Sequence, residues 1–308
     1  MNYGLPYMGS KNRIAQALID VMPKAHTFVD LFAGGCAVTH AAMLSGKYSA
    51  FIANDIDGAM PQLFLDAING KFKDENRWIS REDFERMKKD DAYIRSVWSF
   101  GNNGVTYMYS KEVEPWKKAL HYARFFGDFS LLREFGIDSD GSRADIINHR
   151  DEYKKKYVAW YVENVLGKTF DESLIMQSLE SLERLQSLES LERLQSLESL
   201  QSLERLEVTS GDYRAVNIPD NAVVYCDIPY RSTAEYTAGT FDHDAFYEWA
   251  LSRPFPVFVS EYAMPSEFVC VWDIKHRCIL SGTANNAVTE KLFCNKKDFG
   301  RLGQLSFL

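Results

Sequence analysis

An acid, a proline and a tyrosine stand together at the end of an apolar run, in the segment VYCDIPY at residues 224–230. The apolar residues predict a strand, so Asp227 is expected where that strand ends. A carboxylate there, beside a backbone carbonyl and an aromatic ring, would hold the exocyclic amino group of a base through hydrogen bonds and stacking. A purely structural strand end is the alternative, because Asp and Pro favour turns and Tyr suits a strand margin.

A glycine turn in the segment DLFAGGCAV, residues 30–38, is the second candidate site. Glycines between a strand and a helix let backbone N–H groups approach a ligand, and the start of a helix favours negative groups. Asp55 ends the next predicted strand, where an acid can accept both hydroxyls of a ribose. The pattern indicates a nucleotide-like cofactor, with Asp55 as a turn or helix-cap residue as the structural alternative.

Two separated stretches of the chain predict one α/β sheet that positions these residues. In the first, the predicted order is helix 11–22, strand 27–32, helix 33–44, strand 49–57 and helix 59–70. In the second, it is strand 221–230, helix 242–252, strand 255–262 and strand 289–295. Strand, glycine turn, helix and strand form the βαβ pattern of a parallel sheet. Asp227 would then lie at the carboxyl edge of the sheet, where such folds bind ligands.

The region between these stretches has a different character. Residues 71–173 are rich in Lys, Arg, Trp and Tyr and predict mostly helical structure with one loop, SFGNNGVTYMYS at 99–110. Basic side chains can contact phosphate and polar side chains of the loop can reach base edges. The candidate DNA-binding residues are Asn102, Asn103, Thr106, Lys117, Lys118 and Arg124. Solvated helix faces and ordinary core packing are the alternative interpretation of the same residues.

A repeat occupies residues 174–206. Leucine recurs at every third position from Leu179 to Leu206, and LERLQSLES occurs in tandem at 182–190 and 191–199. Three residues turn an α-helix by about 300°, so these leucines spiral around the axis and form no coiled-coil stripe. We expect a helical insert, grown by duplication, with little part in function.

Composition excludes several classes of protein. The 308 residues carry a net charge of −8, and the five cysteines and six histidines show no metal-binding spacing. The sequence has no apolar run long enough to predict a membrane span, and its N-terminal residues do not predict a secretion signal. We therefore expect a cytoplasmic protein with reduced thiols, without a metal and without a membrane partner.

Five segments in order resemble the Dam-type DNA adenine-N6 methyltransferases: YMGSK (7–11), FVDLFAGG (28–35), ANDI (53–56), SGDYRAV (210–216) and VYCDIPY (224–230). The resemblance implies a Rossmann-like methyltransferase sheet with an inserted, mostly helical target-recognition region. It implies a catalytic domain at 1–70 and 207–308, target recognition at 71–173 and the repeat insert at 174–206. It also implies methyl transfer from S-adenosylmethionine to N6 of a flipped adenine in a specific sequence of double-stranded DNA, with S-adenosylhomocysteine as product.

The same resemblance assigns roles to individual residues. Asp227, Pro229 and Tyr230 would form the catalytic motif. Tyr7 and Lys11 would contact the cofactor from the first segment, Asp55 would hold its ribose and Tyr213 would flank its adenine ring. The full set of cofactor residues that it implies is Tyr7, Lys11, Asp30, Phe32, Gly34, Gly35, Asp55, Tyr213 and Asp227.

The chain departs from the family pattern at one position, since Ile228 replaces the first proline of the usual Asp-Pro-Pro-Tyr motif. That position contributes a backbone carbonyl, which any residue has, so we expect activity to be retained. Methyl transfer to RNA or to cytosine N4, and an impaired DNA-binding relic, remain as alternatives. We expect a monomer or weak dimer in a bacterial or phage-infected cell, serving restriction–modification or acting as an orphan methylase.

Overall fold

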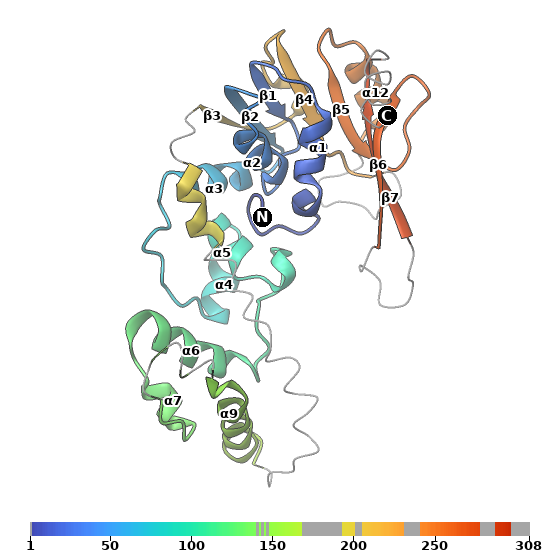
Figure 1. Ribbon diagram of the computed structural model, residues 1–308. Coiled ribbons are helices and arrows are strands. Elements are labelled where there is room, and N and C mark those ends of the chain that lie inside the picture. Colours follow the sequence, from blue (N-terminus) through green and yellow to red (C-terminus); the bar gives the residue numbers. More distant parts are fainter. Residues whose placement is uncertain are drawn as a thin grey trace. The chain divides into compact units, whose positions relative to one another are not determined.

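The computed structural model describes residues 2–139, 142, 145, 148–167, 193–200, 205–230, 241–277 and 287–296. The chain divides into two compact units, which we call the sheet unit (Met1–Lys73 with Arg193–Leu308) and the helical unit (Asp74–Glu192). Figure 1 shows the elements of each unit.

The sheet unit is built on seven strands in the order β3-β2-β1-β4-β5-β7-β6. Their bounds are Thr27–Asp30 (β1), Ala50–Asp55 (β2), Leu206–Ser210 (β3), Ala222–Cys226 (β4), Val257–Glu261 (β5), Val269–Arg277 (β6) and Ala287–Cys294 (β7). Strands β1 to β5 pair in parallel, whereas β7 runs antiparallel to both β5 and β6. The predicted α/β class with a Rossmann-like sheet is confirmed.

The helices of this unit are α1 (Ala15–Val21), α2 (Ala37–Leu44), α3 (Ala59–Ile68) and α12 (His243–Leu251), with short 3-10 turns η1 (Lys11–Arg13), η4 (Leu197–Leu200) and η5 (Tyr213–Ala215). Side chains alternate between the faces of a strand. Val29 of β1 shares a hydrophobic cluster with Phe246 of α12, whereas its neighbour Asp30 contacts Thr39 of α2. Helices α2 and α12 therefore cover opposite faces of the sheet.

Two strands were not predicted from the sequence. Strand β3 lies directly after the repeat, where its leucine continues the period of three. Strand β6 begins with four apolar residues and continues with mostly polar or charged ones, and it pairs only with β7 among the described strands. Of the two antiparallel strands at this side of the sheet, only β7 was predicted, as the strand 289–295. It lies between β5 and β6.

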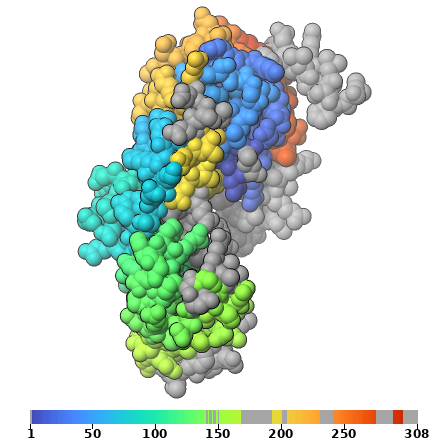
Figure 2. Space-filling model, turned by 60° about the vertical axis from the view of Figure 1, so that its left-hand side comes forward, coloured from blue at the N-terminus to red at the C-terminus, as the bar shows by residue number. Residues whose placement is uncertain are grey.

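Residues 193–200, which belong to the second copy of the repeat and the leucine after it, pack within the sheet unit. They lie beside α3 in Figure 1, and Figure 2 shows them in yellow against the blue surface of that unit. Leu194, Leu197 and Leu200 are buried. The Arg193 guanidinium donates hydrogen bonds to the carbonyls of Tyr3 and Gly4. The first copy, at 182–190, lies outside the described residues.

The helical unit contains α4 (Arg81–Met87), α5 (Ala92–Val97), α6 (Glu114–Phe126), α7 (Ser130–Glu134) and α9 (Arg150–Asn164), with a 3-10 turn η2 (Phe100–Asn102). The mostly helical prediction for this region is confirmed by these elements. Capping explains two helix starts: Ser80 accepts a hydrogen bond from Asp83 N–H, and Asp91 accepts from the N–H groups of Tyr93 and Ile94.

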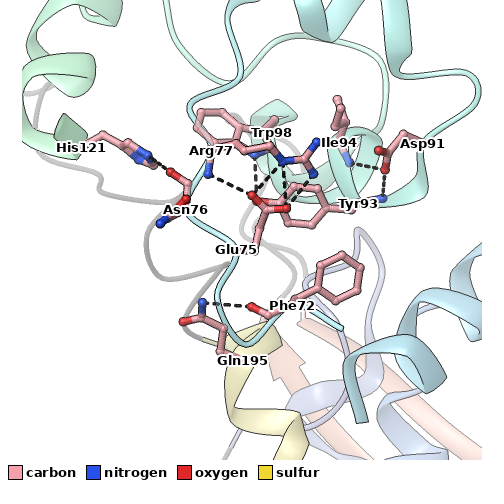
Figure 3. A network of polar contacts seen from close by, with 10 residues as sticks. All are labelled: Phe72, Glu75, Asn76, Arg77, Asp91, Tyr93, Ile94, Trp98, His121 and Gln195. Atoms are coloured by element: carbon pink, nitrogen blue, oxygen red, sulfur yellow. Dashed lines mark hydrogen bonds and ion pairs between the residues drawn. The ribbon is translucent and has the colours of Figure 1, made fainter. Parts of the chain in front are cut away.

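Polar contacts fix the first segment of the helical unit, as Figure 3 shows. Arg77 forms a bidentate ion pair with Glu75, which lowers the pKa of the Glu75 carboxyl despite its partial burial. His121 of α6 lies 2.7 Å from the carbonyl oxygen of Asn76. Burial lowers the pKa of His121, consistent with a neutral ring in an aromatic core.

Candidate functional site

Three acids lie along the carboxyl edge of the parallel sheet. Asp30 ends β1, Asp55 ends β2, and Asp227 directly follows β4. β1 lies between β2 and β4, so the chain leaves β1 toward one side of the sheet and returns to its other side at β4. Such a reversal of strand order places a ligand site at the carboxyl ends of the two strands. The folded chain therefore brings together acids that its sequence separates widely.

The glycine turn lies under the N-terminal segment. Gly34 has a φ of +46°, and its N–H donates to Asp55 Oδ2 at 2.8 Å. A Cβ atom at Gly34 would lie 2.9 Å from Tyr7 Cε1, and one at Gly35 would lie 2.6 Å from Tyr7 Cβ. The Leu5 N–H also donates to the Gly35 carbonyl at 2.7 Å. Both glycines are thus needed for the close packing of Tyr7 on the turn.

Asp55 is held in place by the backbone around it. Its Oδ2 accepts from Gly34 N–H and its Oδ1 accepts from Asp57 N–H at 2.9 Å. Burial raises the pKa of the Asp55 carboxyl, while these two hydrogen bonds act in the opposite direction. Each oxygen of a carboxylate has a second acceptor position, so a pair of ligand hydroxyls can still be accepted.

Asn54 is a positioning residue that sequence reasoning missed. Its Nδ2 donates to the carbonyls of Leu31 and Gly211, each at 3.1 Å, and its Oδ1 accepts from Thr209 Oγ1 at 2.9 Å. These bonds tie the ends of β1, β2 and β3 together. The available signal was an Asn at the end of an apolar strand, where its side chain is expected to be buried. A buried amide must be hydrogen-bonded.

Asp30 is buried, and its two oxygens differ in their contacts. Oδ2 accepts from Thr39 Oγ1 at 2.8 Å, whereas Oδ1 has no hydrogen-bond partner among the described residues. Burial raises the pKa of Asp30 to about 7, and the negative charges of Asp227 and Asp55 add to that rise. An acid whose ionisation is opposed by burial and by two neighbouring acids is stabilised in its charged form by a ligand with positive charge.

Aromatic rings line the part of this edge next to α12. The Phe32 and Tyr213 rings lie 5.4 Å apart at 35°, and Phe241 packs edge-on against Phe32 at 5.7 Å. Tyr213 also packs edge-on against Trp249 at 5.1 Å. The predicted cofactor residues Phe32 and Tyr213 thus lie together. Tyr213 is a buried member of the hydrophobic cluster, whereas Phe32 is only partly buried beside it.

These features fit S-adenosylmethionine, the cofactor that methyltransferases of the resembled family use. The fit rests on an acid for a ribose at Asp55, the partly buried ring of Phe32 beside Tyr213 for a purine, and an acid at Asp30 whose ionised form a cationic methionine moiety would stabilise. The tight contact of Tyr7 with the glycine turn brings a further predicted cofactor residue to the same edge.

The first predicted catalytic residue, Asp227, forms an ion pair with Lys11. Lys11 Nζ lies 2.8 Å from Asp227 Oδ1 and 3.5 Å from Glu290 Oε1. Burial would lower the pKa of Lys11, but the two carboxylates outweigh it and raise this pKa. Burial raises the pKa of Asp227, and the Lys11 charge opposes this rise. The cation therefore helps to keep Asp227 ionised in a buried site.

The next two residues of the motif have different surroundings. Ile228 is 2% exposed and belongs to the hydrophobic cluster between the sheet and α12. The Pro229 carbonyl oxygen lies 2.8 Å from His243 Nε2. The Pro229 carbonyl thus has a partner at the start of α12, and Ile228 anchors the motif to the core.

Tyr230 is held by three neighbours. Its hydroxyl donates to Glu290 Oε1, its ring lies 4.6 Å from the Tyr262 ring at 77°, and Lys11 Nζ lies 4.8 Å from its centroid. Burial, followed by the charges of Asp227 and Glu290, raises the pKa of the Tyr230 hydroxyl. Glu290 was not predicted as a site residue, although an acid within the apolar strand AVTEKLFC was a visible signal.

The candidate base-reading residues lie in a compact loop of the helical unit. Asn102 Nδ2 donates to the Ser96 carbonyl at 2.9 Å, and Asn103 Oδ1 accepts from the N–H groups of Val105 and Thr106. These bonds fix the turn and use polar atoms that were expected to read bases. The exposed apolar side chains of the loop are Phe100 at 58% and Val105 at 66%.

The three candidate phosphate contacts on α6 differ in exposure. Arg124 is exposed and Lys118 is half-buried, with its Nζ 5.6 Å from the Tyr122 ring centroid. Lys117 is 3% exposed, which does not favour a phosphate contact by its side chain. Arg124 and Lys118 are therefore the better candidates of the three.

Two other kinds of site were sought in the described ranges. They contain no cluster of three or more His, Cys, Asp or Glu side chains placed to bind a metal ion. None of their helices has the length and apolar character that a bilayer-spanning segment requires.

Comparison with known proteins identifies a family. No curated protein sequence matches the chain significantly. Residues 7–173, more than half of the chain, match the sequence model for D12 class N6 adenine-specific DNA methyltransferases. The match includes Tyr7, the glycine turn and Asp55, and it ends before β3. The chain therefore belongs to the family of D12 class N6 adenine-specific DNA methyltransferases.

Proposed function

We propose that this enzyme transfers a methyl group from S-adenosylmethionine to N6 of an adenine that is flipped out of double-stranded DNA. The family makes it a site-specific adenine DNA methyltransferase. The observation that carries the finer proposal is the position of Asp227 and Tyr230 at the sheet edge that also holds the glycine turn and Asp55. An amine-binding group and a cofactor site would then meet at one edge.

The cofactor would be held by the residues along β1, β2 and the glycine turn. When bound, S-adenosylmethionine supplies an electrophilic methyl group, so no covalent intermediate with the enzyme is needed. Asp55 would accept the ribose hydroxyls, and Tyr213 with Phe32 would pack on the adenine ring. Asp30 would contribute negative charge near the methionine end, and Tyr7 would close the site over Gly34 and Gly35.

The target amine would be held by Asp227 and by the carbonyl of Ile228. Lys11 binds Oδ1 of Asp227, and Oδ2 would accept an amino N–H of the target base. A hydrogen bond to an ionised carboxylate increases the electron density on the amine nitrogen. Tyr230 would stack on the flipped base and so offset part of the few kcal/mol that flipping costs.

Lys11 would act through Asp227. It was predicted to contact the methionine moiety, but its ammonium lies between the carboxylates of Asp227 and Glu290. We assign it the role of keeping Asp227 anionic, because a protonated carboxyl cannot accept the amine as strongly. A cofactor contact remains a prediction, which cofactor affinity can test separately from the rate.

DNA contacts are assigned to the helical unit. The loop carrying Phe100 and Val105 exposes apolar side chains, and α6 exposes Arg124. Cations would neutralise phosphate, and exposed apolar groups would contact sugars and bases. Asn102, Asn103 and Thr106 are assigned to shaping the loop, and through its shape to the choice of sequence.

The test is transfer of a tritiated methyl group from S-adenosylmethionine to unmethylated double-stranded DNA, followed by separation of the nucleosides. The proposal predicts label in N6-methyl-2′-deoxyadenosine from DNA and little label in RNA. Label in N4-methylcytosine, or in RNA only, would show a different amine substrate. DNA binding without any transfer would show an impaired relic.

A further inference from the structure

Glu290 contacts one end of the proposed catalytic motif, Tyr230, directly and the other end, Asp227, through Lys11, although it belongs to β7, far along the chain. Its Oε1 accepts the hydroxyl hydrogen of Tyr230 and lies 3.5 Å from Lys11 Nζ. Lys11 in turn contacts Asp227 at 2.8 Å. Asp227, Lys11, Glu290 and Tyr230 thus form a continuous series of contacts, which begins at the first and ends at the last residue of the motif.

The burial of Glu290 makes these contacts obligatory. Its side chain is only 6% exposed, and an ionised carboxylate in such a place must be paired and hydrogen-bonded. Lys11 supplies the opposite charge and Tyr230 supplies the hydroxyl donor. Loss of either partner would leave a buried charge less compensated.

We propose that Glu290 is a positioning residue for methyl transfer, which fixes the Tyr230 ring through its hydroxyl and holds Lys11 beside Asp227. The proposal rests on the proposed function, because positioning has meaning only if Asp227 and Tyr230 bind the target base. Glu290 suits this role because it contacts both Lys11 and Tyr230.

The ring of Tyr230 has one more neighbour that limits its movement. Tyr262, directly after β5, packs against it nearly perpendicularly. Because its hydroxyl is hydrogen-bonded to Glu290 and its ring packs against Tyr262, the Tyr230 side chain has little freedom to rotate. Such fixation before the base arrives reduces the entropy cost of capturing it.

Glu290 also influences the charge of Asp227. The charged or titratable groups around Asp227 that bear on its ionisation are Lys11 before α1, Asp30 on β1, Tyr225 on β4, Tyr230 after β4, Glu261 on β5 and Glu290 on β7. The negative charge of Glu290 raises the pKa of Asp227, whereas Lys11 lowers it. Removal of the Glu290 charge should therefore lower the pKa of Asp227 and make its ionised form persist to lower pH.

The experiment compares Glu290→Gln, Tyr230→Phe and the double variant with the wild-type enzyme. Methylation of DNA is followed in single turnovers and as kcat/KM over pH, with thermal unfolding and cofactor binding measured in parallel. Glu267→Gln, which removes the same charge from an exposed position on the sheet unit, is the matched control.

We expect Glu290→Gln and Tyr230→Phe each to slow the single turnover by about tenfold, the size associated with one charge-assisted hydrogen bond. The double variant should be no slower than the slower single variant, because both changes remove the same contact. The acid limb of kcat/KM should move to lower pH in Glu290→Gln and stay in place in Glu267→Gln.

Three results would each overturn the proposal while leaving the proposed function intact. The first is a wild-type single-turnover rate for Glu290→Gln with an unmoved acid limb. The second is full additivity of the effects of the two single variants, and the third is a change confined to thermal stability; either of these would make Glu290 a structural residue only. Absence of transfer to adenine by the wild-type enzyme would instead contradict the proposed function itself.

Discussion

Lys11 Nζ lies 2.8 Å from Asp227 Oδ1, so that a residue near the start of the chain pairs with the acid of the catalytic motif. The pair joins η1 to the end of β4 across the carboxyl edge of the sheet. It places a positive charge beside the carboxylate that we assign to the target amine. The ionisation of Asp227, and with it the pH range of activity, should therefore depend on Lys11.

Replacement of Lys11 by Met should narrow that pH range. Lys11 opposes the rise in pKa that burial causes at Asp227, so its loss should raise this pKa further. The acid limb of kcat/KM should move to higher pH, opposite to the shift expected for Glu290→Gln. Lys24→Met, at an exposed position, is the control. Weaker cofactor binding with an unmoved limb would favour the predicted contact with the methionine moiety.

Asp55 should contribute to cofactor affinity and little to the chemical step. In Asp55→Asn, an amide replaces a carboxylate oxygen, and a ribose hydroxyl loses its charged acceptor. We expect calorimetry to show binding of S-adenosylmethionine weaker by roughly 1–3 kcal/mol, the cost of an unmet hydrogen bond in a buried site. Glu248→Gln, an exposed change on α12, should bind normally. Equal affinities for all three proteins would remove Asp55 from the cofactor site.

One unit of the repeat should be dispensable. Deletion of 182–190 and deletion of 191–199 give the same polypeptide, because the two copies are identical. In either case one LERLQSLES copy remains to provide the contacts that Arg193 makes with Tyr3 and Gly4. The shortened enzyme should methylate DNA at a rate close to that of the full chain.

The same shortened enzyme allows the role of Arg193 to be tested, because no second LERLQSLES copy remains to supply another arginine. Changing the arginine of the remaining LERLQSLES copy to Ala should lower the unfolding temperature, because two partly buried carbonyls lose their donor. An unchanged unfolding temperature would show that these hydrogen bonds add nothing to stability. Loss of all methylation after deletion alone, in a folded protein, would show a function of the repeat that we have not assigned.

The sequence predicted the carboxyl edge of the sheet well, because parallel strands are apolar and end in polar residues. Asp55 and Asp227 could each be placed at a strand end from the local pattern alone, whereas Asp30 lay within the predicted strand 27–32, which the structure ends at Asp30. Their common edge then followed from the βαβ arrangement. The glycine turn was equally visible, since Gly34 and Gly35 lie directly between β1 and α2.

Contacts between distant segments could not be predicted from local patterns. Glu290 reaches the motif only because β7 runs antiparallel beside β5, and β6, the partner of β7 on its other side, was not recognised. The Lys11–Asp227 pair likewise depends on how the N-terminal segment crosses the sheet edge. Spacing along the sequence contains no information on such a pair.

Polar residues of the helical unit show a second limit. Asn102 and Asn103 were candidates for base contacts because they are polar and lie in a loop, but their side chains bond the backbone of that loop. A sequence does not reveal whether an Asn side chain stabilises a turn or faces a ligand. Nor does the sequence reveal that the side chain of Lys117 is buried whereas that of its neighbour Lys118 is half-buried.

The most direct test of the account is single-turnover formation of N6-methyladenine in DNA by the wild-type enzyme and by Asp227→Asn. The variant keeps the shape of the side chain but removes the charge that accepts the amine. With cofactor binding and thermal unfolding close to wild type, its rate should fall by about 100-fold or more, as when one preorganised partner of a reacting group is lost. A folded, cofactor-binding Asp227→Asn enzyme that methylates adenine at the wild-type rate would contradict the account.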